Sequence, residues 1–263
     1  MANVKFLYES VSDATVSASA GSAAGYDITN IQDPNPNVIW KSPAATNNQT
    51  VVAQFAAARA VDTVIIDGIN GSALSRASLV LWLQSSPDGA AWTNQVGFAG
   101  GTLANVTRLK QEIASVSQPY WRLIFIDSAG ALLAAPEIGS LYLGTRFEPD
   151  IPYNESPDHG EQFTTSFSRA LDKTPYASQS ISDGIETWKS LVWFRVPGTI
   201  RLGFLKMSHA CRGKLKPLYF IDTDATIYLV YLPDRVKEQA VMFDQYTISL
   251  EFEAFLPGTI KLT

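Results

Sequence analysis

The side chains able to carry nucleophilic or metal chemistry are few in this chain. It has two histidines, His159 and His209, and a single cysteine, Cys211. Metal sites need several nitrogen, sulfur or carboxylate ligands at defined spacing, and neither an H-x-x-x-H nor a C-x-x-C pattern occurs. On a helix, His209 and Cys211 would point to different faces, which keeps them from acting together as base and nucleophile. We therefore expect no metal site, structural or solvated histidines, and a partly buried structural thiol.

Acidic side chains are the other candidates for chemistry, because glycoside hydrolysis uses two carboxylates about 5 to 9 Å apart in a cleft. No sequence pattern pairs the acids of this chain, and Asp88 lies in Ser86-Pro87-Asp88-Gly89, where a turn explains it. The glycine-bearing segments 68–71 and 97–101 lack the Lys-Ser/Thr that follows a phosphate loop. The sequence therefore predicts a protein that is not an enzyme, with no catalytic residue and no cofactor. The acids considered are Asp62, Asp67, Asp88, Asp127 and Glu137.

Composition sets the class of protein. The 263 residues are 46% hydrophobic and 17% charged, which suffices for a large core in one large or two ordinary domains. A net charge of −5 argues against a nucleic-acid-binding surface. We find neither an apolar run of about 18 residues nor a secretory signal, so we expect no membrane insertion. One cysteine fits folding in a reducing cytoplasm.

Two halves differ in pattern. The first has short strands separated by Gly, Pro or Asn, including a hairpin in which the strand from Leu79 turns at Ser86–Gly89 and resumes at Trp92. Residues 146–160 hold three prolines and no hydrophobic period, so they predict a linker. In the second half, Tyr246, Ile248, Leu250 and Phe252 alternate with polar residues, as in a half-buried strand. We expect a short helix over 200–211 and strands over 162–169, 217–222, 225–232 and 246–255. Residues 190–196 predict either a further strand or the start of a helical stretch.

The first half resembles the discoidin-type, galactose-binding-like jelly roll. The resemblance covers about residues 25 to 145 and consists of ordered segments: Val38–Ser42, Thr50–Phe55, Val61–Gly68, the 79–93 hairpin, Pro119–Ile126 and Glu137–Gly144. It implies a β-sandwich, with Trp40, Trp92 and Trp121 buried in its core. It also implies ligand loops at one end, with counterparts here in 30–37 and 70–75.

The loop 30–37 leaves two interpretations open. Its polar side chains can hydrogen-bond a glycan, but Asn and Pro are ordinary loop formers and the loop lacks the aromatic face that sugar sites use. The candidate glycan-contact residues are Asn30, Gln32, Asp33, Asn35 and Asn37.

The second half, with a short helix followed by strands and a closing alternating strand, is similar to the C-terminal part of tail-tip proteins of tailed bacteriophages. Together the resemblances imply an all-β protein: a jelly-roll sandwich over 1–147, a linker over 148–160, and a β-rich, tail-tube-like domain with one short helix over 161–263. They imply a distal or minor tail protein in the virion, made in the host cytoplasm and forming a ring around the tail tube. A carbohydrate-binding module for cell-surface glycans is the alternative.

A ring implies a homo-oligomer, six-fold or three-fold, that contacts the tail tube, tip hub or tape measure. Two runs, Leu191–Phe194 and Tyr228–Leu232, are more continuously apolar than a half-solvated sheet needs. Burial within the monomer is the alternative explanation of these runs. The candidate interface residues are Trp193, Phe194, Tyr228 and Tyr231, and the residues open to either a core or an interface role include Phe163, Phe167, Trp188 and Tyr246.

Overall fold

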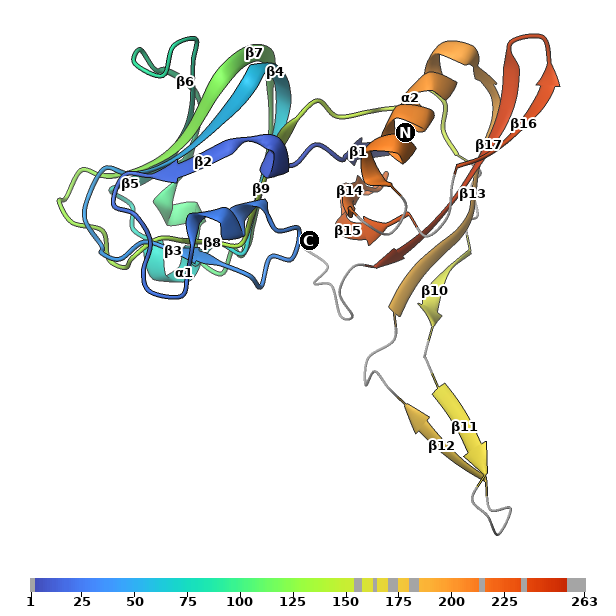
Figure 1. Ribbon diagram of the computed structural model, residues 1–263, viewed down its shortest axis with the longest axis horizontal. Helices are drawn as coiled ribbons and strands as arrows, with labels where there is room; N and C mark the ends of the chain where they lie inside the picture. The colour runs from blue at the N-terminus through green and yellow to red at the C-terminus, as the bar shows by residue number, and fades with distance from the viewer. Residues whose placement is uncertain are drawn as a thin grey trace. The chain divides into compact units, whose positions relative to one another are not determined.

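The chain divides into two compact units (Figure 1). Residues 9–146 form the first, which we call the sandwich unit. The second unit combines residues 1–8 with residues from 147 onward. The computed structural model describes residues 3–153, 158–162, 165–169, 175–179, 185–212, 216–232 and 236–254.

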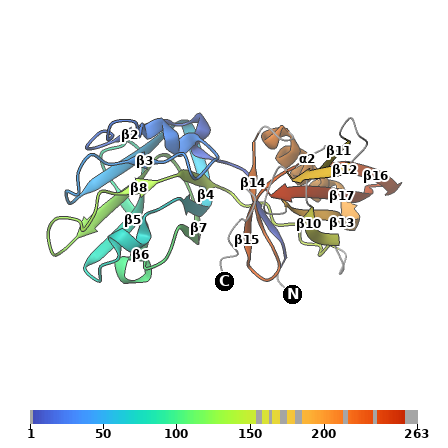
Figure 2. The same ribbon diagram turned by 90° about the horizontal axis from the view of Figure 1, so that it is seen from below.

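Antiparallel strands build the sandwich unit. Its larger sheet has the order β2-β4-β7-β5-β6, with β9 also paired to β4, and β3 pairs with β8 (Figure 2). The strands are β2 (Thr15–Ala18), β3 (Trp40–Lys41), β4 (Gln49–Asp67), β5 (Leu79–Ser86), β6 (Thr93–Ala99), β7 (Arg108–Asp127), β8 (Glu137–Ile138) and β9 (Ser140–Gly144). Short helical turns lie at η1 (Val11–Asp13), η2 (Ile28–Gln32), α1 (Gly71–Leu74) and η3 (Gly100–Thr102).

The long strands β4 and β7 form both layers of the sandwich. Their pairing is interrupted between Gln54 and Arg59 and again between Val61 and Thr63. Irregularities of this kind bend a strand pair and increase its twist. Residues from before and after these breaks, such as Val51 and Val64, belong to one hydrophobic core. The predicted β-sandwich, and with it the all-β fold class, is confirmed.

The second unit is built on one antiparallel sheet with the order β1-β14-β15-β17-β13-β10, and β16 also pairs with β17. Helix α2 (Gly198–Cys211) packs against it through Phe204, Met207 and Cys211. The strands are β1 (Lys5–Leu7), β10 (Asp158–Gln162), β13 (Ile185–Pro197), β14 (Leu218–Ile221), β15 (Ile227–Tyr231), β16 (Lys237–Met242) and β17 (Gln245–Ala254).

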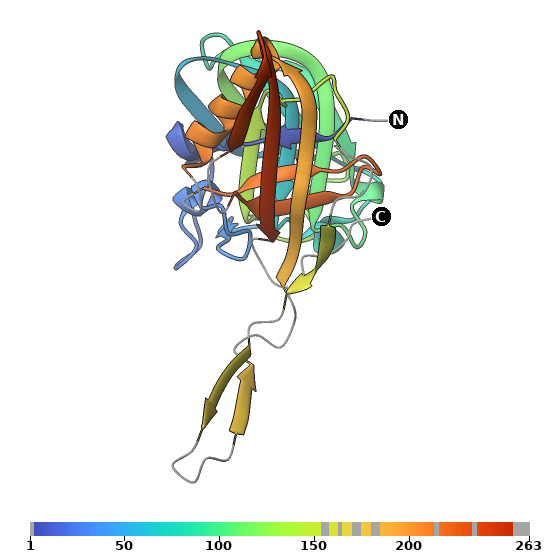
Figure 3. The same ribbon diagram turned by 90° about the vertical axis from the view of Figure 1, so that its right-hand side faces the viewer.

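A further hairpin consists of β11 (Thr165–Arg169) and β12 (Pro175–Gln179), which lie between β10 and β13 in the sequence (Figure 3). In the described part of the chain these two strands pair only with each other. An isolated two-stranded hairpin is marginally stable in water, so this element depends on other contacts for its stability.

The assignment of residues 1–8 to the N-terminal domain is wrong. β1 pairs with β14 of the second unit, with Phe6 opposite Phe220. Phe6 is fully buried, its ring stacks on Phe220, and its backbone exchanges hydrogen bonds with Phe147. A buried phenylalanine in a central aromatic cluster gives a strong reason for this pairing, because burial of such a side chain contributes about 1.5–3 kcal/mol.

The helix and most of the strands expected in the second half are present in the structure. The predicted helix and the strands near 217–222, 225–232 and 246–255 are confirmed, residues 190–196 are part of strand β13, and Ile248, Leu250 and Phe252 are buried as the alternation indicates. The linker prediction is wrong at its end, because residues 158–160 belong to β10. The strand expected over 162–169 falls on β10 and β11, and Phe163 lies outside the described residues. No helix in the described ranges has the length and apolar character needed to cross a membrane.

Candidate functional site

The predicted glycan-contact loop uses several of its polar groups within the fold. Asn30 donates from Nδ2 to the carbonyl of Ile39 at 2.8 Å. Gln32 donates from Nε2 to the carbonyls of Val11 and Ala14, at 3.0 and 2.8 Å. These bonds hold the loop to neighbouring chain segments.

The other three residues of that loop form successive turns. The backbone N–H of Asn35 donates to Asp33 Oδ1 at 2.8 Å, and the N–H of Asn37 donates to Asn35 Oδ1 at 3.0 Å. Such local bonds are the ordinary use of Asp and Asn in loops. Asp33 and Asn37 remain exposed, and glycan contact by the loop stays a prediction.

The four candidate interface residues have different environments. Trp193 and Tyr228 are buried in the core of the second unit. Tyr231 is half-buried, and Phe194 is 60% exposed. Their part in a subunit interface remains a prediction. Of the residues open to either role, Phe167 and Trp188 are described only through their backbone.

The three tryptophans expected in the sandwich core do not share one environment. Trp40 and Trp121 are fully buried, and their indole N–H groups donate to the carbonyls of Gly21 and Gln118. The prediction for Trp92 is wrong. Trp92 is half-buried and lies outside the core, with the guanidinium carbon of Arg122 4.2 Å from its ring centroid.

Strand alternation explains why these groups meet outside the core. On β5 and β7, Leu81, Leu83 and Leu123 point into the core. Side chains alternate between the two faces of a strand, so Trp82, Gln84 and Arg122 lie on the outer face. Gln84 is directly opposite Arg122 in the β5–β7 pairing and opposite Asn94 in the β5–β6 pairing. We call Trp82, Gln84, Trp92, Asn94 and Arg122 the Trp–Arg face.

Hydrogen bonds fix the polar centre of the Trp–Arg face. Arg122 donates from Nε to Gln84 Oε1 at 2.6 Å, and Gln84 donates from Nε2 to Asn94 Oδ1. This chain sets the orientation of all three side chains. Nη1 and Nη2 of Arg122 have no hydrogen-bond partner among the described residues, and neither has Nδ2 of Asn94. The face therefore offers several free N–H donors.

Trp82 lies flat against the neighbouring strand because that strand has a glycine opposite it. A Cβ built on Gly97 would be 2.8 Å from Cζ3 of Trp82 and 3.0 Å from Cε3 and Cη2. A larger residue at position 97 would lift the ring. Trp82 is half-buried, so the ring packs on Gly97 while part of its surface stays open to solvent.

A tight turn positions Trp92. Asp88 Oδ1 accepts from the backbone N–H groups of Ala90 and Ala91, at 2.9 and 3.0 Å, and from the Ser86 hydroxyl. These hydrogen bonds, the one from Ala90 foremost, lower the pKa of Asp88. Gly89 has a φ of +75°, which glycine adopts without strain. The turn predicted from Ser86-Pro-Asp-Gly is thus confirmed, and Trp92 follows directly after Ala91, whose N–H group Asp88 binds.

The electrostatic setting of Arg122 is unusual for its unit. The other arginines between residues 9 and 146 each approach a carboxylate: Arg59 with Asp13, Arg76 with Asp127, Arg108 with Asp67, and Arg146 with Asp62 and Glu112. Arg122 has no such partner in the described part of the chain. Partial burial lowers the pKa of Arg122, although a guanidinium stays protonated at any physiological pH.

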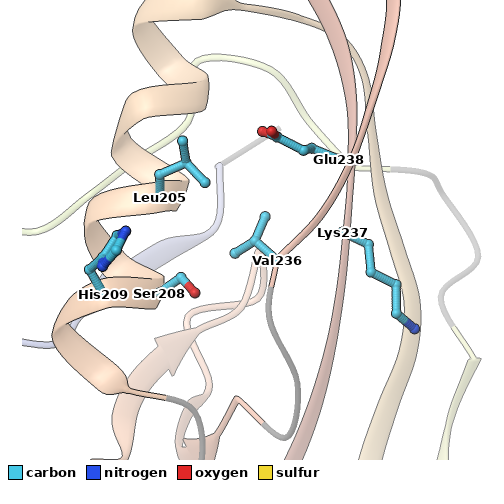
Figure 4. A pocket seen from close by; sticks show the side chains of 6 residues that line it. All are labelled: Leu205, Ser208, His209, Val236, Lys237 and Glu238. Carbon is cyan, nitrogen blue, oxygen red and sulfur yellow. The ribbon is translucent and has the colours of Figure 1, made fainter.

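The second unit has a cavity of about 550 Å³ between α2 and β16 (Figure 4). Ser208 and His209 line it from the helix, and Glu238 lines it from the strand. Both carboxylate oxygens of Glu238 accept from Arg201, at 2.7 and 2.8 Å. These contacts engage Glu238 with Arg201, and among the described residues no hydrogen bond joins Glu238 to Ser208 or His209. We therefore place no chemistry in this cavity.

Groups expected to be structural can be placed as well. Cys211 is buried in the core of the second unit, and burial raises the pKa of its thiol to about 12. A thiol with this pKa is a poor nucleophile at neutral pH. Within the described residues, no cluster of His, Cys, Asp and Glu is arranged to hold a metal ion.

Sequence reasoning named Trp92 but assigned it to the core, and it gave no role to Trp82, Gln84, Asn94 or Arg122. A signal was available for part of this set. Trp82 and Gln84 alternate with Leu81 and Leu83, so they fall on the solvent side of a half-buried strand. The contact between Trp92 and Arg122 had no local signal, because it depends on the pairing of β5 with β7.

No protein-family model and no curated protein matches the chain. Among solved structures, it is similar to chitosan-binding module 1 of a chitosanase/glucanase from Paenibacillus sp. IK-5, with 14% identity, a TM-score of 0.42, and coverage of 52% of this chain and 99% of that one. It is also similar to CpGH89CBM32-5 from Clostridium perfringens, solved with GalNAc-beta-1,3-galactose, with 11% identity, a TM-score of 0.42, and coverage of 53% and 99%.

Proposed function

We propose that the sandwich unit is a carbohydrate-binding module and that the Trp–Arg face is its site. One observation carries this proposal: two half-buried tryptophans, Trp82 and Trp92, lie on one sheet face beside free N–H donors of Arg122 and Asn94. An aromatic ring gives the apolar C–H side of a pyranose a flat surface, while the amide and guanidinium donors fit its hydroxyl groups.

Rigidity of the Trp–Arg face supports this proposal. Trp82 rests on Gly97, Trp92 is held by the Asp88 turn, and Arg122 is fixed by Gln84. A face whose side chains are already ordered loses little conformational entropy on binding, which favours affinity for a small ligand. The predicted loop at 30–37 lacks such aromatic surfaces.

The test is glycan-array screening of the full chain, followed by calorimetry with any glycan that binds. The Trp92→Ala variant should lower the affinity about tenfold or more, equivalent to roughly 1.4 kcal/mol. Tyr26→Ala is the matched control, because Tyr26 is an aromatic residue of the same unit, 40% exposed and placed beside a cation, Lys41. Equal affinity of both variants and the parent chain would overturn this site.

We further propose that binding is the whole activity of this unit and that no turnover follows. The sandwich acids considered for hydrolysis have structural partners: Asp67 pairs with Arg108, Asp127 with Arg76, and Asp88 with its turn. Incubation of the protein with its bound glycan should release no product detectable by mass spectrometry. Product formation that is lost on substituting one of these acids would contradict the proposal.

A second proposal concerns the second unit: it is an assembly domain that makes the chain a structural component of a bacteriophage tail tip, as a ring in the virion. The observation that favours assembly is the β11–β12 hairpin, which pairs only with itself among the described residues. The edge strand β16 is exposed along its length, and at the adjoining turn Phe243 is 98% exposed. Such surfaces are typical of strands and tips that meet another chain.

Self-association tests the assembly proposal directly. Native mass spectrometry at rising concentration should show a closed oligomer, six-fold or three-fold, and Phe243→Ser should weaken it without changing the melting temperature. Phe220→Ser, in the buried core, is the contrasting variant that should unfold the unit.

The tail-tip assignment has its own test: the chain should be present in stoichiometric amounts in purified virions. Its absence from virions, or a single copy per tail, would reject that assignment.

A further inference from the structure

The positive charge of Arg122, at the centre of the Trp–Arg face, favours a ligand that carries a negative charge. Arg122 is partly buried, and no described carboxylate lies near enough to pair with it. Partial burial of a cation without a counterion is unfavourable, and every other arginine of the sandwich unit avoids it through an acidic partner. A ligand that brings an anion would remove this cost, whereas a neutral ligand would not.

The nitrogens of Arg122 that have no partner among the described residues further limit the kind of anion. The ring of Trp92 covers one side of the guanidinium, and Nε is taken by Gln84. The Nη1 and Nη2 groups remain, and they form a planar fork with two parallel N–H donors. A carboxylate matches that fork with two coplanar oxygens, which gives a bidentate, charge-assisted pair.

We infer that the Trp–Arg face selects acidic saccharides, in which a uronic acid carboxylate binds the Nη1–Nη2 fork of Arg122 while the sugar rings pack on Trp82 and Trp92. This inference rests on the proposed function of the same face. It adds the ligand class, which stacking alone leaves open.

A comparison within the unit gives the matched control. Arg59 also stacks on an aromatic ring, with its guanidinium carbon 4.0 Å from the centroid of Phe55. Its nitrogens are engaged by Asp13 and by the carbonyl of Ser10. Arg59 is therefore a stacked arginine with its counterion already in place, and it should contribute nothing to the binding of an acidic glycan.

The experiment uses the full chain and an array of uronic-acid oligosaccharides, each printed as the free acid and as its methyl ester. We expect binding to the acid, and a loss of about 10- to 100-fold in affinity on esterification or on the Arg122→Gln substitution. Arg122→Lys keeps the charge but not the fork, so it should restore affinity only in part. Arg59→Gln should bind as the parent chain does. An unchanged circular dichroism spectrum and a cooperative unfolding transition would show that each variant is folded.

The alternative outcomes separate the inference from the proposal beneath it. Equal binding of acids and esters, with loss only on Trp92→Ala, would overturn the acidic specificity and leave carbohydrate binding intact. Arg122-dependent binding of sulfated glycans but not of uronic acids would also overturn the carboxylate assignment. Binding to no glycan, acidic or neutral, would overturn both. Equal loss in Arg122→Gln and Arg59→Gln would show a nonspecific effect of charge and reject the site.

Discussion

The guanidinium carbon of Arg122 lies 4.2 Å from the centre of the Trp92 ring, and this contact joins β7 to the turn between β5 and β6. Each residue is positioned by its own neighbours, Arg122 by Gln84 and Trp92 by the Asp88 turn. The contact therefore links two separately ordered parts of the sheet surface. It also makes the two residues energetically dependent on each other, which is measurable without any ligand.

A double-mutant cycle should detect this dependence. Trp92→Ala and Arg122→Gln, made singly and together, are expected to show a coupling of about 0.5–1 kcal/mol in the free energy of unfolding, as for a cation–π pair near the surface. Urea unfolding of the four proteins gives the value. Additive effects of the two substitutions would show that the stacking contributes nothing to stability.

Gly97 should control the position of Trp82. In Gly97→Ala the new methyl group would lie 2.8 Å from the Trp82 ring, so the ring must move and the affinity for a glycan should fall about tenfold. Gly101→Ala is the control, because its nearest neighbour would be 4.0 Å away. Calorimetry on both variants compares them, and an unchanged affinity in Gly97→Ala would exclude Trp82 from the site.

The buried ion pair between Asp67 and Arg108 should be a main determinant of sandwich stability. Arg108 donates from Nε to Asp67 Oδ2 at 2.8 Å, and both side chains are almost inaccessible. Removing one partner of a buried pair leaves an uncompensated charge, so Asp67→Asn should lower the free energy of unfolding by about 3 kcal/mol. Asp13→Asn breaks the more exposed pair with Arg59 and should cost less than about 1 kcal/mol. Chemical denaturation would refute the account if the two losses were equal.

Acid should weaken the turn that holds Trp92. Hydrogen bonds from Ala90, Ala91 and Ser86 lower the pKa of Asp88 below its ordinary value of 3.8. The charged form therefore stabilises the folded state above pH 3.8, and this contribution is lost as the pH falls through the lower, folded-state pKa. Asp88→Asn cannot titrate, so its melting temperature should fall less between pH 5 and about pH 2 than that of the parent chain. An equal fall in both proteins would contradict the assigned role of Asp88.

Local patterns in the sequence sufficed for elements whose two faces differ in environment. Ile248, Leu250 and Phe252 alternate with polar residues, and all three are buried in β17. The Ser86–Gly89 turn was predictable because proline and glycine fix its backbone locally. The position of helix α2 was predictable from its sequence. The helix ends at Cys211, and the next residue, Arg212, has a left-handed backbone conformation with a φ of 49°.

Pairing between distant segments was not predictable from such patterns. β1 pairs with β14, which lies more than 200 residues later in the sequence, and the residues Lys5-Phe-Leu7 do not indicate which strand they pair with. The resemblance predicts a core position for Trp92, whereas the Asp88 turn holds it outside the core. A register shift in the β5–β6 pairing between Leu83 and Gln84 brings Asn94 opposite Gln84, and the β5–β7 register brings Arg122 opposite the same residue. Neither pairing has a signal in the local sequence.

The indole N–H signals of the tryptophans offer the most direct test of the central claim, that the Trp–Arg face is the glycan site. Two-dimensional nitrogen–proton spectra of the full chain, assigned with single Trp→Phe variants, would be recorded while a glycan that binds on the array is added. We predict that the signals of Trp82 and Trp92 shift with saturation, while those of the buried Trp40 and Trp121 stay in place. Shifts confined to backbone amides of residues 30–37, with Trp82 and Trp92 unmoved, would contradict it.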